Sequence, residues 1–217
     1  MPLIDLSQPF TDGMFALSVF PRVSVERIVR IEERGLNVTK VEFAVHAGTH
    51  LDSPRHFFAD GRPIEQLTLD EVSGPAVGLA VERGPMEQIT AADLEANSPL
   101  PEPGEIVFVH TGWGRHFQGD HALYHRHPYL SADAADWLVE RRVKMLAMDV
   151  ATPDLPEGSR PPGFDWPVHH TLLGNGVLVA EHLANLDQVV GRRFRAYLLP
   201  LRIQGSDGSP VRAVGEL

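Results

Sequence analysis

Short apolar runs, separated by Gly, Pro or charged residues, are the main pattern along this chain. Runs of this length are typical of β-strands. They predict strands over residues 41–46, 76–81, 106–110, 143–149, 177–180 and 196–203.

Two helices are predicted from capping patterns between these strands. Thr90 with Asp93 three residues later is typical of a capping box and predicts a short helix to about residue 97, and Ser131 can cap a second helix over residues 132–142. Residues 112–128 and 151–167 lack clear periodicity and are predicted to be long loops of the kind that form lids or pockets. The expected class is α/β with a mixed sheet.

Composition indicates one globular domain over residues 1–217, because 43% of the residues are hydrophobic and 22% are charged. A formal net charge of -10 disfavours nucleic acid and anionic lipid as partners. Cysteine is absent, so a bound metal would be held by nitrogen and oxygen atoms. We see no leader pattern and no apolar run long enough for a membrane span, so a cytoplasmic enzyme is expected.

The most informative stretch lies between residues 41 and 56. In an extended chain its alternation points the apolar side chains to one face and His46 to the other. The same alternation places His50, Asp52 and His56 on the His46 side. Full extension would separate the His46 and His50 Cα atoms by about 13 Å, so the chain must bend, and Gly48 gives it that freedom.

Imidazole and carboxylate groups in this pattern suit zinc or manganese. We predict His46, His50 and Asp52 as metal ligands, with the carboxylate able to bridge a second ion. His56 lies beyond the bend and is predicted to stay metal-free as a general acid or base. The alternative is a set of surface or core-edge histidines that share no ion.

Further ligands must come from a distant part of the chain. His169 or His170 is a candidate, and after a turn at Asn175-Gly176 an apolar strand leads to Glu181. The alternative for Glu181 is a solvated residue at the end of a strand, which is more common for a lone Glu than a role as a metal ligand.

Together these stretches resemble a known family. The pattern that carries the resemblance is His46-x-Gly48-Thr49-His50-x-Asp52-x-Pro54-x-His56-Phe57. It resembles the main motif of the metal-dependent cyclase-like hydrolases, which include bacterial kynurenine formamidases and isatin hydrolases. Three further stretches agree with that family: residues 5–9, 111–113 and 207–212.

The resemblance implies a ligand set and a fold. His46, His50 and Asp52 would hold one zinc or manganese ion, and Asp52, His169 and Glu181 would hold a second ion when the site is dinuclear. His169 is preferred to His170 because its spacing to Glu181 agrees with the family pattern. His56 matches the family's acid/base. The implied fold is a swivelling β/β/α domain, usually in a homodimer or larger homo-oligomer.

The implied activity is metal-dependent hydrolysis of a small amide, of the arylformamidase type that converts N-formylkynurenine to kynurenine and formate in tryptophan catabolism. An isatin-like lactam hydrolase and a dehydrating cyclase are alternatives within the family. A non-catalytic metal-binding scaffold is an alternative of another class, and the presence of His56 argues against it.

Two aromatic residues are candidates for contact with the substrate. The family's kynurenine formamidases carry a Trp-Pro-Gly-Asp-like stretch near the N-terminus, where this chain has Phe20-Pro21-Arg22. Phe20 is therefore predicted to form an aromatic wall. Trp113 is a second candidate, with core packing as its alternative. The histidines between residues 110 and 127 match no metal motif, and we expect them to be solvated or to line a pocket.

Overall fold

A closed barrel of strands forms the centre of the protein, whose computed structural model describes residues 2–217. Four strands run parallel in the order β5 (Ser73–Ala80), β7 (Ile106–His110), β9 (Met145–Met148) and β10 (Leu178–Glu181). On the other side of β5 lie β11 (Arg193–Pro200) and then β12 (Gly208–Glu216), both antiparallel to their neighbours. The short strand β4 (His50–Asp52) pairs with both β12 and β10, and this closes the barrel.

The remaining elements are short. β1 (Leu3–Asp5) pairs with β12 outside the barrel, and β6 (Gln88–Ile89) pairs with β8 (Tyr129–Leu130). Helix α3 (His121–Tyr124) and the single 3-10 turns Pro54–His56, Ile64–Gln66, Trp113–His116, Glu157–Ser159 and Leu186–Gln188 lie in the connections.

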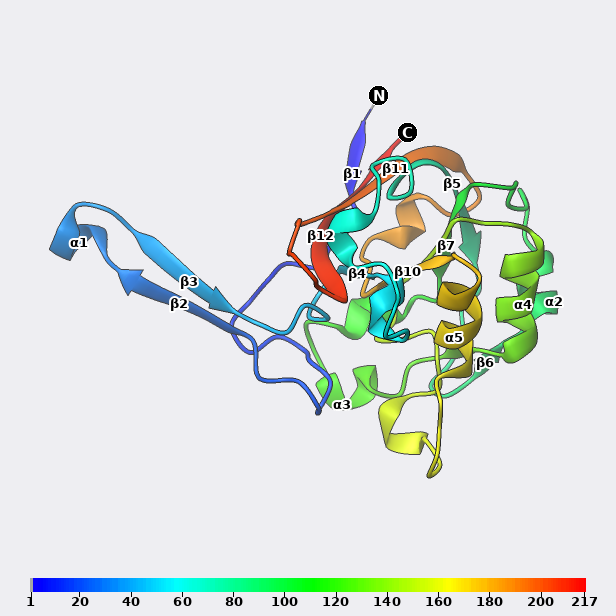
Figure 1. Cartoon of the computed structure of the whole chain (residues 1–217), viewed down its shortest axis with the longest axis horizontal. Helices are drawn as coiled ribbons and strands as arrows, with labels where there is room; N and C mark the ends of the chain where they lie inside the picture. Colours follow the sequence, from blue (N-terminus) through cyan, green and yellow to red (C-terminus); the bar gives the residue numbers. More distant parts are fainter. Residues whose placement is uncertain (1) are drawn as a thin grey trace.

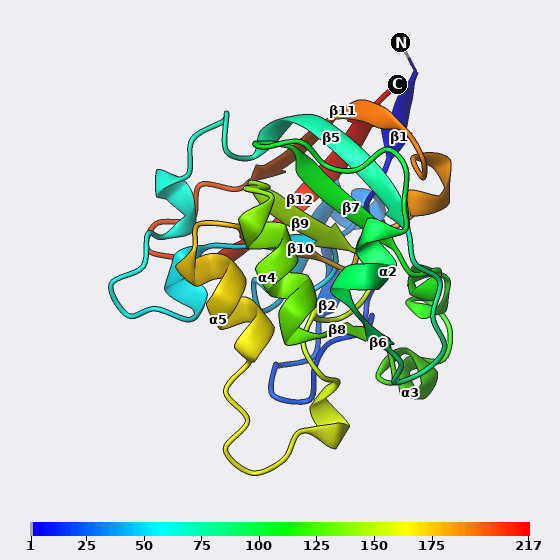
Figure 2. The ribbon, with the colours of Figure 1, turned by 90° about the vertical axis from the view of Figure 1, so that its right-hand side faces the viewer.

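Three helices cover one side of the barrel, where α4 (Ala132–Glu140) lies between α5 (Pro167–Gly174) and α2 (Ala91–Glu95) (Figure 2). Thr90 and Asp93 form the predicted capping box of α2, and the Ser131 hydroxyl accepts the Ala134 N–H at the start of α4. These caps satisfy N–H groups that have no partner inside the helix, so both helices begin where the sequence predicts.

The core has two parts, one on each face of the parallel strands. In β7, Ile106 and Phe108 belong to the barrel interior, whereas Val107 and Val109 pack against the helices. Because both faces are covered, such strands are apolar along their whole length, and this explains why they were visible in the sequence.

A long hairpin projects from the body, drawn in blue in Figure 1. It consists of β2 (Ser24–Val29) and β3 (Val38–Glu42), joined through α1 (Ile31–Arg34), and residues 24–42 are called the arm below. The exposed side chains of the arm include Ile28, Ile31, Leu36, Val38 and Val41.

The predicted strand over residues 41–46 is wrong. Strand β3 ends at Glu42, and the chain then turns, with the Ala47 N–H donating to the Ala44 carbonyl and Gly48 at a φ of 64°. The arm is solvated on both faces, so alternation of side chains does not mark where it ends. His46 therefore reaches the body through a turn.

The α/β class with a mixed sheet is confirmed, and the other five predicted strands are present with their ends shifted by a few residues. The barrel closure and the strands β1, β2, β4 and β12 were not predicted, nor was helix α5. The swivelling arrangement stays a prediction. Between residues 2 and 217, no helix combines the length and the apolar character that a membrane span requires.

Candidate metal centre

Strands β4 and β10 bring three of the predicted ligands together. His50 and Asp52 are two residues apart in β4 and share a face, and Glu181 lies directly opposite His50 in the register. The His50 Nε2 atom lies 3.3 Å from Asp52 Oδ1 and 3.3 Å from Glu181 Oε2. All three side chains are buried.

His169 joins this group from the first turn of α5. Its Nε2 atom lies 3.4 Å from Asp52 Oδ2 and 3.2 Å from Glu181 Oε1. Asp154 accepts the backbone N–H groups of Val168 and His169, and its Oδ2 lies 2.6 Å from His169 Nδ1. One buried carboxylate therefore both caps the helix and orients the ring.

The neighbouring His170 is placed differently. Its ring is exposed, and its Nδ1 contacts the Asp165 carbonyl oxygen. The structure therefore brings His169, and not His170, to the other predicted ligands.

His46 and His56 lie on the other side of Asp52 and share one partner. His46 Nδ1 is 2.8 Å from Asp52 Oδ1, and His46 Nε2 is 2.8 Å from Asp207 Oδ2. His56, on the 3-10 turn after β4, has its Nδ1 3.3 Å from the same Asp207 oxygen. The two imidazole rings stack with centroids 3.9 Å apart. Asp207 therefore orients both histidines.

Three buried atoms at the centre have no hydrogen-bond partner in the structure: His50 Nε2, His169 Nε2 and Asp52 Oδ2. The other ring nitrogens of these histidines are held, by the Gly48 carbonyl and by Asp154. Two ligand atoms about 2.0–2.1 Å from a tetrahedral ion lie about 3.3 Å apart, close to the separations found here. A divalent cation would satisfy all three atoms, so the residues fit a nitrogen and oxygen site.

The electrostatics of the cluster also favour a positive charge at its centre. Burial by itself lowers the pKa of His50, but the nearby carboxylates of Asp52 and Glu181 outweigh it and raise the pKa to about 10. Burial by itself raises the pKa of Glu181, but His169 and His50 outweigh it and hold the pKa at about 2. The carboxylates therefore stay ionised and attract either protons or a cation.

Three groups of side chains place their ligand atoms within 4.8 Å of one another. One is the predicted second set of Asp52, His169 and Glu181. The other two combine His46 and Asp52 with His56, and His50 and Glu181 with His182. The structure thus brings all six predicted residues to one place and adds His182.

A cavity of about 40 Å³ opens beside this centre and is lined by Phe20, His46, His56, His169 and Glu181 among others. The Phe20 ring stacks on His46 with centroids 5.8 Å apart and an interplanar angle of 21°. Phe20 therefore lines the cavity beside the candidate metal ligands, where an aromatic wall for the substrate would lie.

Trp113 is not at this cavity, and its prediction as a substrate wall is corrected. The side chain is buried in the core, and its Nε1–H donates to the Tyr124 carbonyl at 3.1 Å. Trp113 begins the 3-10 turn that lies three residues after the end of β7, and its indole packs in the core between barrel and loops. Of the nearby histidines, His127 is also buried, and none between residues 110 and 127 belongs to a metal-ligand group in the described part of the chain.

Comparisons with known proteins identify the family of this chain. The model of the family described as "Putative cyclase" matches residues 4–155. The chain belongs to this family. A kynurenine formamidase of Bacillus mycoides is 30% identical over 212 residues, which cover 97% of this chain and 95% of the relative. A Bacillus cereus kynurenine formamidase is equally similar.

Among solved structures, isatin hydrolase A from Ralstonia solanacearum superposes with a TM-score of 0.85 at 24% identity and covers 99% of this chain and 91% of its own. Isatin hydrolase A from Labrenzia aggregata reaches a TM-score of 0.87 at 22% identity, with 100% and 93% covered. These two structures show that the fold is shared.

Sequence reasoning missed Asp154, Asp207 and His182. Asp207 lies in a stretch that resembles the family, but only the positions of Asp154 and Asp207 next to the histidines reveal a role. His182 follows a predicted ligand, and its Nδ1 lies 2.9 Å from the Tyr124 hydroxyl. Only the fold reveals that contact, because it joins residues 58 positions apart in the chain.

Proposed function

We propose that this protein is a metal-dependent hydrolase that cleaves the amide of an N-formyl aromatic amine, of the arylformamidase type. The observation that carries the proposal is the cluster of unpartnered atoms on His50, His169 and Asp52 beside the cavity that His56 lines. We propose His46, His50, Asp52, His169 and Glu181 as the residues that would hold one or two ions of zinc or manganese.

A divalent cation at this centre supplies Lewis-acid polarisation of the carbonyl and a lower pKa for the attacking water. The chain's own contribution is proton transfer by His56. Asp207 holds the Nδ1 side of this ring, and the ring lines the cavity. His56 would accept the proton from the water as its oxygen bonds to the amide carbon, and would give it to the nitrogen when the C–N bond breaks. The products are a carboxylic acid and an amine.

For N-formylkynurenine these products are formate and kynurenine, and we propose this substrate because the Bacillus relatives at about 30% identity are kynurenine formamidases. A lactam is the second candidate, because the neighbours with the same fold include isatin hydrolases. In a lactam the released amine stays attached to the product, so the same residues serve both reactions.

The experiment is an assay of zinc- or manganese-reconstituted protein against N-formylkynurenine, isatin and a set of simple amides. Turnover of N-formylkynurenine supports the proposal, and turnover of isatin alone supports the lactam. Metal-loaded protein that hydrolyses none of them would favour the non-catalytic alternative.

Two variants separate the roles within the site. His56→Ala should reduce turnover about a hundred- to ten-thousand-fold with metal content unchanged. Asp52→Ala should lose metal, measured by elemental analysis of dialysed protein. His121→Ala, at an exposed histidine, is the control. Full turnover in His56→Ala would show that the assigned role is wrong.

We also propose that two copies of the chain associate through the arm. An isolated two-stranded hairpin is marginal in water, and this one exposes five large apolar side chains. Its mixture of acidic and basic residues, including Glu26, Arg27 and Lys40, suits a self-complementary contact. Light scattering on Ile28→Asp should report a smaller species than wild type if the arm joins the subunits.

A further inference from the structure

A second, wider cavity lies beside the metal centre. It has a volume of about 590 Å³ and is lined mainly by aromatic and apolar side chains, among them Phe20, Phe57, Phe164 and Trp166. The small cavity at the metal centre shares Phe20, Phe57 and Trp166 with it, so the two cavities are neighbours. A planar aromatic ring fits such a lining.

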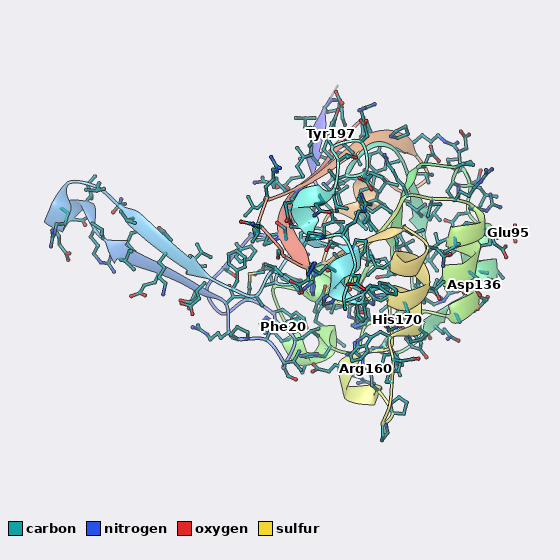
Figure 3. The ribbon with its side chains drawn as sticks, in the orientation of Figure 1. Phe20, Glu95, Asp136, Arg160, His170 and Tyr197 are labelled. Carbon is teal, nitrogen blue, oxygen red and sulfur yellow. The ribbon has the colours of Figure 1, made fainter. Side chains whose placement is uncertain are left out.

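Arg160 lines both cavities and carries a permanent positive charge. Its guanidinium carbon lies 5.4 Å from the Phe164 ring centroid and 5.3 Å from the Trp166 ring centroid. Its Nε–H donates to the Leu155 carbonyl at 2.8 Å. Figure 3 labels Arg160, Phe20 and His170, which lie along the lower side of the body in that view.

The rest of this guanidinium lacks partners. Its Nη2 atom is buried and has no hydrogen-bond partner, and Arg160 forms no ion pair with any residue in the part of the chain that the structure describes. Burial lowers the pKa of Arg160, but a guanidinium stays charged in proteins. A buried donor of this kind is costly unless an acceptor binds to it.

The loop that carries Arg160 is tethered to the N-terminal segment. Glu157 accepts hydrogen bonds from the Ser18 hydroxyl at 2.6 Å and from the Ser18 N–H at 3.3 Å. Arg160 therefore lies between this tethered loop and the aromatic residues Phe164 and Trp166.

We propose that Arg160 binds a carboxylate of the substrate while the substrate's amide lies at the metal centre. The inference rests on the proposed hydrolase function and narrows its substrate class to aromatic amides that carry a carboxylate. The aromatic ring would lie against Phe20 and Trp166, and the guanidinium N–H groups of Arg160 would donate to the carboxylate oxygens. Such charge-assisted bonds are among the stronger ones in proteins.

The test compares two substrates that differ only in the carboxylate, 2-formamidobenzoate and formanilide, in metal-loaded protein. Arg160→Met should raise KM for 2-formamidobenzoate about 10- to 100-fold and leave KM for formanilide unchanged. Arg160→Lys should recover part of the loss. Arg126→Met, at an exposed arginine that lines neither cavity, is the matched control.

A binding measurement keeps this inference separate from the proposed function. The affinity for 2-aminobenzoate, followed by its fluorescence, should fall by the same factor in Arg160→Met, while the affinity for aniline should not change. If wild type hydrolyses neither these amides nor N-formylkynurenine but shows this Arg160-dependent binding, the proposed function fails and the recognition of a carboxylate by Arg160 stands.

Two results would overturn the inference. An equal loss of kcat on both substrates with KM unchanged would place Arg160 at the reacting carbonyl. Equal KM and equal affinity in wild type and Arg160→Met would show that the guanidinium recognises no carboxylate.

Discussion

The contact between Asp154 and His169 leads to a quantitative prediction about metal affinity. Asp154 Oδ2 lies 2.6 Å from His169 Nδ1 and also accepts the His169 backbone N–H, while Oδ1 accepts the Val168 N–H. Both carboxylate oxygens therefore face donors. In Asp154→Asn one of these oxygens becomes an NH₂ group that faces a donor, whichever way the amide is turned.

The expected result is metal binding weaker by about 10- to 100-fold, because the partner that orients a ligand histidine usually contributes that much. The factor corresponds to about 1.4–2.8 kcal/mol, which agrees with about 1.5–3 kcal/mol for one hydrogen bond to a charged group. If the NH₂ group faces Nδ1, the ring must carry its proton on Nε2, which then cannot bind metal.

The assay is a competition titration of zinc between dialysed protein and a chromogenic chelator. Asp165→Asn changes an exposed carboxylate in the same loop and serves as the control. A zinc affinity within twofold of wild type in a folded Asp154→Asn protein would refute the reasoning, as would an equal loss in the control.

Three further predictions concern the scaffold. A Cβ added at Gly78 would lie 2.2 Å from the Val189 carbonyl oxygen, so Gly78→Ala should lower Tm by several degrees, whereas Gly158→Ala, with nothing within 4 Å, should not. Burial lowers the pKa of His127 to about 4, so its stabilising contribution is complete above pH 6.5 and declines as the pH falls towards 4, by up to about 3 kcal/mol. The free energy of unfolding, measured by denaturation at several pH values in this range, should therefore change less with pH in His127→Gln than in wild type. An equal pH dependence in the two proteins would contradict the assignment. Trp113→Phe should lower Tm and leave KM unchanged, and a raised KM would restore the indole as a substrate wall.

Much of the barrel is predictable because strands buried on both faces are continuous apolar runs, as in residues 106–110. The caps at Thr90 and Ser131 are equally local and were also found. The arm was not predicted, since its exposed ribbon lacks a buried face that would set its ends. Strand β4 was missed because three residues are too few to show a period.

The candidate metal centre could also be predicted in part, where its residues are close in the sequence. His50 and Asp52 are neighbours on one strand, so their shared face is visible in the sequence. Asp207 lies 161 positions from His46, and no local pattern predicts that contact. The direction of the Trp113 side chain could not be predicted either, because an aromatic residue close to a site in the sequence can face the cavity or the core.

Strand β4 has a consequence for the order in which the protein assembles. It supplies two of the proposed ligands, and it also closes the barrel by pairing with β10 on one side and with β12 on the other. Closing the cylinder and completing the ion-binding group are therefore one event. Zinc should therefore stabilise the pairing of β4 with its two neighbours. It should slow deuterium uptake at the amides of residues 50–52 more than at the amides of the parallel strands.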